Sequence, residues 1–391
     1  MPSDADSIAE RKGIFGRLFP PLKAETSELL HLDALRLIAS LAIVVSHFKL
    51  EAYQWPGSAR LFQNMQTMNV FVDVFFVISG IVIAYVYKQT IQTPGAFGQF
   101  LRKRFARLAP LHWATLAFYV ALAIVGAKLG AAQAASQKYD WNCLLPNLLA
   151  VHSFGVCKAL SFNNVSWSIS AEMAMYVIFP LLIIAMSKAP RTAVLLCLAG
   201  VIGLTTFDYF YYGRLLWTER TYDYAPVRAL PAFALGVAVF INKEVLIRFA
   251  LPSWLAATTV LALLLGTFLG LSKLVLIPLA YASAILAFRC DITGQKPSRL
   301  VHVFALGGIL TYSLYMLHPI VGVVLIKIGA ERVLHLSGWP MNAWILLSTL
   351  AVFPPAYLSY VWFERPLRRA LSGSRPARLA PTSSLNQQSS N

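Results

Sequence analysis

Long apolar segments, separated by short polar ones, run through most of the chain. Each is close to the ~20 residues that an α-helix needs to cross a bilayer. Only helices and closed barrels satisfy their backbone polar groups in lipid, so the pattern predicts an all-α polytopic transmembrane helix bundle. Ten spans are predicted, at residues 31–48, 70–88, 111–129, 166–186, 192–207, 226–242, 251–271, 273–289, 303–326 and 342–363.

The first segment, HLDALRLIASLAIVVSHF, carries ionisable residues inside its apolar run. Arg36 and His47 are eleven positions apart. At 100° per residue they return to within about 20° of the same helix face, and they lie about 16 Å apart along the axis. Ionisable groups at this depth usually face the bundle interior or a water-filled cavity, so we expect a functional site. The alternative is a snorkelling arginine and a histidine at the opposite membrane face.

Composition supports a membrane protein. The 391 residues are 58% hydrophobic and 13% charged, against about 25% charged in a typical soluble domain. The net charge of +16 is spread over the ends of the apolar segments. Membrane topology therefore explains it better than nucleic-acid binding. Residues 1–30 lack the apolar core of a cleavable signal peptide, so the first span is expected to act as an uncleaved anchor.

The loops indicate an orientation. Ten spans put both termini on one side, whose segments hold 21 Lys and Arg, whereas the opposite segments hold ten. Cytoplasmic loops carry the excess of positive residues, so the prediction is N-in and C-in. Three regions follow: a cytoplasmic N-terminal tail (1–30), a transmembrane domain (31–369) and a disordered cytoplasmic tail (370–391).

The cysteines indicate no metal site. Cys143 and Cys157 fall in one predicted external loop. There they either form a disulfide, as an oxidising compartment allows, or remain two free thiols. Cys197 and Cys290 lie in or at the ends of spans and look like small apolar side chains. Since no His/Cys cluster has zinc spacing, we predict no metal.

The second span, NVFVDVFFVISGIVIAYVY, also contains polar positions. The apolar residues around Asp73 offer no nearby partner for its charge, so Asp73 is either functional or placed near the outer interface. Ser79 and Gly80 form a small-residue site where a neighbouring helix or a ligand can come close.

The basic segment FGQFLRKRFARLAPLHW is expected to lie in the cytoplasmic interface as an amphipathic helix. Arg104 and Arg107 are three residues apart and share a helical face. Guanidinium groups bind phosphates bidentately, which suits the 3′-phosphate and pyrophosphate of coenzyme A. The alternative is contact with anionic lipid headgroups.

Three later segments contain further candidates. Glu172, in WSISAE, either orients a histidine or binds a sugar hydroxyl; the alternative is a helix-start carboxylate favoured by the macrodipole. In YSLYMLHP, Tyr315 and His318 follow Thr311 at i+4 and i+7, which makes a polar stripe. Glu364, in FERP, is either a cap at a helix end or an ion-pair partner for the arginines of the basic segment.

Six fragments together resemble the acyltransferase 3 family: Arg-x10-His in the first span, FFVISG, RKRFARLAP, WSISAE, YSLYMLHP and FERP, in this order. The resemblance extends from about residue 31 to residue 369. It implies about ten spans in the cell (inner) membrane and O-acylation of a carbohydrate from cytoplasmic acyl-CoA, chiefly acetyl-CoA. Some members add an extracytoplasmic esterase-like domain. None follows the bundle here, so we expect transfer to be completed by the bundle or by a separate polysaccharide-assembly partner.

This prediction assigns roles to single residues. His47 is the general base or a transient acyl carrier, and both remain open. Arg36 steers the thioester or stabilises the oxyanion, and Glu172 orients the acceptor or the histidine. The other candidates are Arg104, Arg107, Ser79 and Gly80 for acyl-CoA binding, with Asp73, Tyr315, His318 and Glu364 as supporting residues.

Two other functions are compatible with polar residues inside spans. The first is a transporter or flippase without covalent chemistry, although no two-half repeat is evident, as many transporter folds would show. The second is a regulatory partner of a polysaccharide assembly complex.

Overall fold

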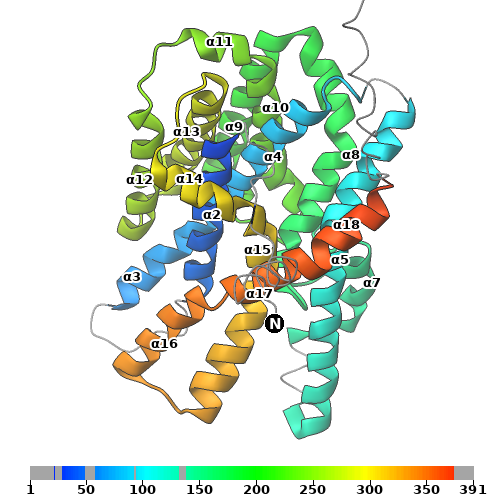
Figure 1. Ribbon diagram of the computed structural model, residues 1–391, viewed down its shortest axis with the longest axis vertical. Coiled ribbons are helices and arrows are strands. Elements are labelled where there is room, and N and C mark those ends of the chain that lie inside the picture. Colours follow the sequence, from blue (N-terminus) through cyan, green and yellow to red (C-terminus); the bar gives the residue numbers. More distant parts are fainter. Residues whose placement is uncertain (1–21, 23–28, 49–57, 92–93, 132–137, 374–391) are drawn as a thin grey trace, which may run out of the picture.

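The computed structural model describes residue 22 and residues 29–48, 58–91, 94–131 and 138–373. All regular elements in these ranges are helical, which confirms the predicted all-α bundle (Figure 1). Most of the predicted N-terminal tail (1–30) and most of the predicted C-terminal tail (370–391) lie outside the described residues.

The helices follow one another through the bundle with short connections. The first half of the chain contains α2 (Leu30–Phe48), α3 (Ser58–Met65), α4 (Phe71–Tyr87), α5 (Pro94–Gly126), α7 (Leu144–Leu148), α8 (Trp167–Lys188) and α9 (Pro190–Tyr212). The second half contains α10 (Ala225–Ile241), α11 (Lys243–Arg248), α12 (Trp254–Leu269), α13 (Lys273–Ile292), α14 (Arg299–Gly307), α15 (Thr311–Val321), α16 (Gly338–Leu350), α17 (Phe353–Leu358) and α18 (Arg365–Ser372). Wider helical turns occupy Ala127–Ala131, Gly322–Val333 and Ser359–Glu364.

Eight helical stretches in the described part of the chain are long and apolar enough to cross a membrane, and α10 and α12 are shorter apolar helices. Each predicted span coincides with one of these ten segments. The outer surface is apolar as well: on α9, the exposed side chains include Leu195, Leu196, Ile202, Phe207 and Phe210. So large an apolar surface needs a covering, and here the bilayer provides it. The chain is a multi-pass membrane protein.

Several predicted boundaries are wrong. The basic segment is not a separate interfacial helix, because α5 continues from Pro94 to Gly126 without a break. Phe100 holds its first part inside the bundle, where the ring is buried between Tyr87 and Phe179. The two last spans are broken into shorter pieces. At Gly308, between α14 and α15, an added Cβ would lie 2.7 Å from the carbonyl oxygen of Asp33, so α2 crosses this break closely.

The centre of the bundle is a close contact between α4 and α10. A Cβ added at Gly80 would lie 2.1 Å from the carbonyl oxygen of Phe233, and one added at Gly236 would lie 2.2 Å from that of Val77. Only glycine allows two helix backbones to approach in this way. This contact sets the positions of the helices that carry the polar residues.

A buried ion pair joins the same two helices. Arg228 on α10 donates from Nε and Nη2 to the two carboxylate oxygens of Asp73 on α4, at 3.1 and 2.7 Å. Its guanidinium also lies over the ring of Trp167, 5.1 Å from the centroid. The expectation that Asp73 has no partner for its charge is therefore wrong. The partner is 155 residues away in the sequence.

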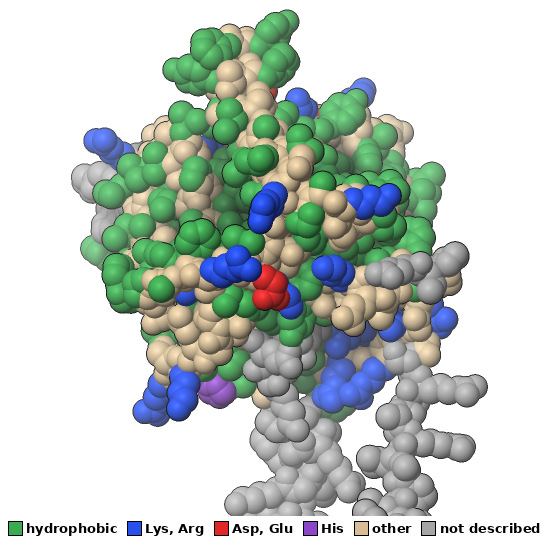
Figure 2. Space-filling view, turned by 90° about the horizontal axis from the view of Figure 1, so that it is seen from above, with side chains coloured by type: hydrophobic (Ala, Val, Ile, Leu, Met, Phe, Trp, Pro, Cys, Tyr) green, Lys and Arg blue, Asp and Glu red, His purple; other side chains and the backbone are tan. Residues whose placement is uncertain are grey.

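The two ends of the bundle carry different loops. Figure 1 places α11 at the upper end, and α16 and the last turns of α5 at the lower end. Figure 2, which views the upper end, shows Lys and Arg side chains spread over the surface between hydrophobic ones. One of the predicted segments rich in Lys and Arg, residues 243–248 in α11, lies at this end.

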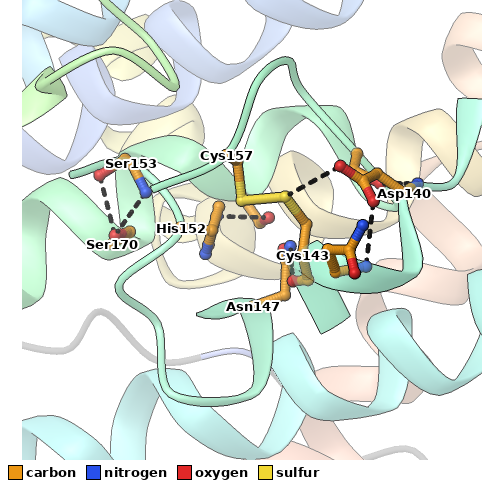
Figure 3. The surroundings of a disulfide bond; sticks show 10 residues. Asp140, Cys143, Asn147, His152, Ser153, Cys157 and Ser170 are labelled. Carbon is orange, nitrogen blue, oxygen red and sulfur yellow. Dashed lines mark hydrogen bonds between the residues drawn. A yellow bond between two sulfur atoms is a disulfide. The ribbon is translucent and has the colours of Figure 1, made fainter. Parts of the chain in front are cut away.

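The loop between α5 and α8 is folded against the bundle (Figure 3). Cys143 and Cys157 form a disulfide, one of the two predicted alternatives. Ser153 donates through its hydroxyl to Ser170 of α8 at 2.8 Å. The ring of His152 stacks on His112 at a centroid distance of 5.8 Å. Burial, together with the neighbouring His112, lowers the pKa of His152 to about 3.

Candidate functional site

A cavity of about 760 Å³ opens among α2, α4, α5, α8 and α15. Below, this space is called the arginine cavity. Its lining includes six of the predicted site residues: Arg36, Ser79, Arg104, Arg107, Glu172 and Tyr315.

Three guanidinium groups line the arginine cavity. Arg36 pairs with Asp33 at 3.0 Å on α2. Arg104 donates to the hydroxyl of Tyr87 at 3.0 Å. Its Nε is buried and has no hydrogen-bond partner among the described residues. Arg107 lies on the same face of α5, one turn later. The concentrated positive charge makes this cavity suitable for an anionic ligand.

Glu172 lines the same cavity as the arginines. One of its carboxylate oxygens accepts a hydrogen bond from the hydroxyl of Ser79 at 2.9 Å and another from the hydroxyl of Tyr176. In the described part of the chain it makes no hydrogen bond to a histidine. The structure thus gives no support to the alternative in which Glu172 orients His47, whereas its place in the cavity is compatible with ligand binding.

His47 lines a second cavity, of about 700 Å³, here called the histidine cavity. Its side chain is exposed. The predicted shared face is therefore present: two cavities lie along one side of α2, with Arg36 in the first and His47 in the second. The remaining lining combines cationic, amide and aromatic side chains, including Lys138, Lys327, Asn164, Tyr119 and Phe162.

A thin layer of side chains separates the two cavities. Tyr315, in the wall of the arginine cavity, accepts from the hydroxyl of Ser168 at 2.9 Å and donates to the carbonyl oxygen of Val165 at 3.0 Å. Val165 itself lines the histidine cavity. His318 is fully buried, with its ring 6.0 Å from that of Tyr315 and 5.0 Å from that of His47.

His318 is an unusual member of this layer. Its Nδ1 lies 3.3 Å from the carbonyl oxygen of Leu314, one turn earlier on α15. Its Nε2 is buried and has no hydrogen-bond partner in the part of the chain that the structure describes. A buried polar atom of this kind costs about 1–3 kcal/mol, so its retention beside His47 suggests a role at the site.

Besides His47 and His318, three predicted residues lie outside the arginine cavity. The carboxylate of Asp73 forms an ion pair with Arg228, and the backbone of α10, not a ligand, fills the space beside Gly80. Glu364 lines a smaller neighbouring cavity and accepts hydrogen bonds from Ser313 and Ser359. Within the described residues, no group of three or more His, Cys, Asp or Glu side chains is placed to hold a metal ion.

Comparison with known proteins shows the family of this chain. The family model described as an acyltransferase domain, of the acyltransferase 3 type, matches residues 29–361. The chain belongs to the acyltransferase 3 family. The resemblance carried by the six fragments is thus confirmed.

Two curated proteins are similar to parts of this acyltransferase 3 chain. Acyltransferase MdmB of Streptomyces mycarofaciens is 32% identical over 176 residues, which are 44% of this chain and 43% of that protein. Protein 2 in the picA locus of Rhizobium radiobacter is 35% identical over 103 residues, 24% of this chain and 48% of that protein. The matched part thus spans less than half of either relative. No solved structure matches.

Sequence reasoning missed some residues of the candidate cavities and of the helix pair beside them. Arg228 had a usable signal, since an arginine inside an apolar span calls for a partner. Arg365 and Arg368 follow FERP, but nothing in the linear pattern indicates that they reach Arg107. Tyr312, which lines both the arginine cavity and the smaller one, looks like an ordinary span tyrosine in the sequence.

Proposed function

We propose that this acyltransferase 3 protein is an O-acyltransferase of the cell (inner) membrane. It moves an acyl group, acetyl in the first instance, from cytoplasmic acyl-CoA to a hydroxyl group of a cell-envelope or exported carbohydrate. The observation that carries the proposal is the pair of cavities along one face of α2, one lined by three arginines and the other by His47.

The arginine cavity is assigned to the acyl donor. Arg104 and Arg107 hold phosphate groups of coenzyme A, for which planar guanidinium forks are well suited. Arg36, in the same cavity, steers the thioester or stabilises the negative charge that develops on its carbonyl oxygen. Glu172, Ser79 and Tyr176 form a hydrogen-bonded group that fixes the remaining wall.

The histidine cavity is assigned to the carbohydrate. As a base, the imidazole of His47 takes the hydroxyl proton while the hydroxyl oxygen attacks the thioester carbonyl and the thiolate of coenzyme A leaves. As an acyl carrier, the imidazole attacks first and releases the thiolate, and the hydroxyl then attacks the acyl-imidazole. In both cases the layer of Tyr315 and His318 has to open for the acyl group to pass.

The orientation follows from the loop charges. The segments with 21 Lys and Arg are assigned to the cytoplasm and those with ten to the opposite side. The donor cavity then opens on the side where acyl-CoA is made, and His47 lies about 16 Å further along α2, toward the acceptor.

The test uses the purified protein in proteoliposomes with radiolabelled acetyl-CoA and a pool of envelope glycans. We expect label in the glycan and one coenzyme A thiol released per acetyl group transferred. His47→Ala should abolish both, whereas His302→Ala, an exposed histidine on α14, should leave both unchanged.

The same assay distinguishes the two roles of His47. Without a glycan, an acyl carrier releases up to one thiol per protein molecule in a rapid burst, whereas a base releases none. No thiol release in the presence of any glycan, with uptake of intact glycan into the vesicles, would instead show a transporter.

A further inference from the structure

A smaller cavity lies beside the arginine cavity. The two share Arg107 and Tyr312 in their linings, so they are neighbours across one layer of side chains. The smaller one is called the C-terminal basic cavity, because its other residues come mainly from the end of the bundle: Ile309, Tyr360, Glu364, Arg365 and Arg368.

The C-terminal basic cavity carries an excess of positive charge. Three guanidinium groups, those of Arg107, Arg365 and Arg368, face one carboxylate, that of Glu364. Glu364 is fixed by hydrogen bonds from the hydroxyls of Ser313 and Ser359, the latter at 3.1 Å. Such a carboxylate can hold an arginine cluster in place without neutralising it. A phosphate monoester, with its two negative charges, matches the charge that remains.

The helix that supplies two of these arginines is tied to the bundle. Nε of Arg102 on α5 donates to the carbonyl oxygen of Leu371 at 2.7 Å, which satisfies a carbonyl group at the C-terminal end of α18. Arg365 and Arg368 are three residues apart and share one face of α18, turned to the cavity. The next residue, Arg369, is exposed.

Two tyrosines add flat apolar walls. Tyr312 is fixed because its hydroxyl donates to the carbonyl oxygen of Leu108 on α5. Tyr360 lies in the turns that precede α18. A purine ring stacks favourably on such side chains. Arginines together with aromatic walls are the combination that binds a phosphorylated nucleoside.

We propose that the C-terminal basic cavity binds the nucleotide end of the acyl donor, with its 3′-phosphate between Arg365 and Arg368. The pyrophosphate then reaches Arg104 and Arg107, and the pantetheine arm extends into the arginine cavity. The inference rests on the proposed function, because it requires a donor that is a coenzyme A thioester. The phosphate of an anionic lipid has the same charge chemistry and is distinguished by the experiment.

The experiment compares acetyl-CoA with acetyl-dephospho-CoA, which lacks only the 3′-phosphate, in the wild type and three variants. In the wild type, KM for acetyl-dephospho-CoA should be about tenfold or more higher, as expected for lost hydrogen bonds to a charged group. Arg365→Gln and Arg368→Gln should raise KM for acetyl-CoA to a similar extent and leave KM for acetyl-dephospho-CoA and both kcat values unchanged. Arg369→Gln is the matched control and should behave as the wild type.

Each other outcome overturns the inference. A wild type that does not discriminate between the two donors excludes a 3′-phosphate site, even if a variant fails to fold. Equal loss with both donors shows that the arginines act elsewhere. A loss seen only in vesicles containing phosphatidylglycerol, and absent in pure phosphatidylcholine, assigns the cavity to lipid.

A binding measurement separates this inference from the proposed function. Adenosine 3′,5′-bisphosphate should raise the melting temperature of the detergent-purified wild type, and adenosine 5′-monophosphate should do so much less. If the protein proves inactive with every acetyl donor but shows this difference, the proposed reaction is wrong and the nucleotide site stands. If the protein is active and shows no difference, the nucleotide site is wrong and the proposed reaction stands.

Discussion

Replacing Gly80 by alanine places a methyl group in the closest helix contact of the bundle's centre. The new Cβ would lie 2.1 Å from the carbonyl oxygen of Phe233 on α10, whereas ordinary contact begins at 3.4 Å. The obstacle is backbone, which cannot rotate away as a side chain can. The two helices must therefore separate locally by roughly 1 Å, the difference between these two distances.

This separation acts on two sources of stability. Overpacking of a tight core alone costs about 1–3 kcal/mol. The hydrogen bonds between Asp73 and Arg228, at 2.7 and 3.1 Å, join the same two helices and lengthen with them. A total of about 2–4 kcal/mol is therefore expected, since hydrogen bonds between charged groups are worth about 1.5–3 kcal/mol. A fall of several degrees in the melting temperature should follow.

Thermal unfolding of the purified protein in detergent measures this change, and acyl transfer gives KM for acetyl-CoA. We expect Gly80→Ala to lower the melting temperature while the fraction that remains folded keeps its KM. Gly200→Ala and Gly203→Ala on α9 are the controls, because a Cβ at either position meets nothing within 4 Å. If Gly80→Ala melts with the wild type and instead has a raised KM, the glycine lies in the donor site and the packing argument fails.

Three further outcomes are expected. Asp73→Asn or Arg228→Met should each lower the free energy of unfolding by about 3–5 kcal/mol, because each leaves the other charge buried without a partner. The double replacement removes both charges and should therefore cost less than the sum of the two; additive losses would contradict the buried pair. Burial lowers the pKa of His152 to about 3, so between pH ~6.5 and pH 3 the unfolded chain binds a proton on this imidazole and the folded chain does not. The stability that His152 contributes is complete above pH ~6.5 and declines toward pH 3, and His152→Gln should flatten this decline in melting temperature. In a background without the native cysteines, cysteine at position 138 should react with an impermeant thiol reagent in intact cells and cysteine at position 99 should not; the reverse pattern would invert the orientation.

The sequence was sufficient for properties that depend on one helix at a time. Apolar runs located the segments, and the helical repeat placed Arg36 and His47 on one face and Arg104 and Arg107 on another. Six of the predicted residues then converged on one cavity, because polar groups inside spans turn away from lipid.

Properties that depend on two helices could not be predicted in the same way. The partner of Asp73 is on a helix far along the chain, and the hydrophobic periodicity of α4 does not indicate which helix packs against it. For the same reason Gly80 was assigned to a ligand when it contacts a backbone. The division of the polar track into two cavities depends on Tyr315 meeting Val165 and Ser168 and on His318 packing against Tyr315 and His47, which only the packed structure reveals.

The thin layer between the two cavities also decides where the membrane voltage falls. If water fills both cavities, most of the potential drop is concentrated across Tyr315 and His318 rather than spread over the bilayer. Moving one elementary charge through this field involves about 2.3 kcal/mol per 100 mV. An uncharged acyl group crosses the layer without electrical work, whereas the charged coenzyme remains on its own side. The proposed reaction would then transfer an acyl group from a donor on one face of the membrane to a carbohydrate on the other face, without changing the membrane potential.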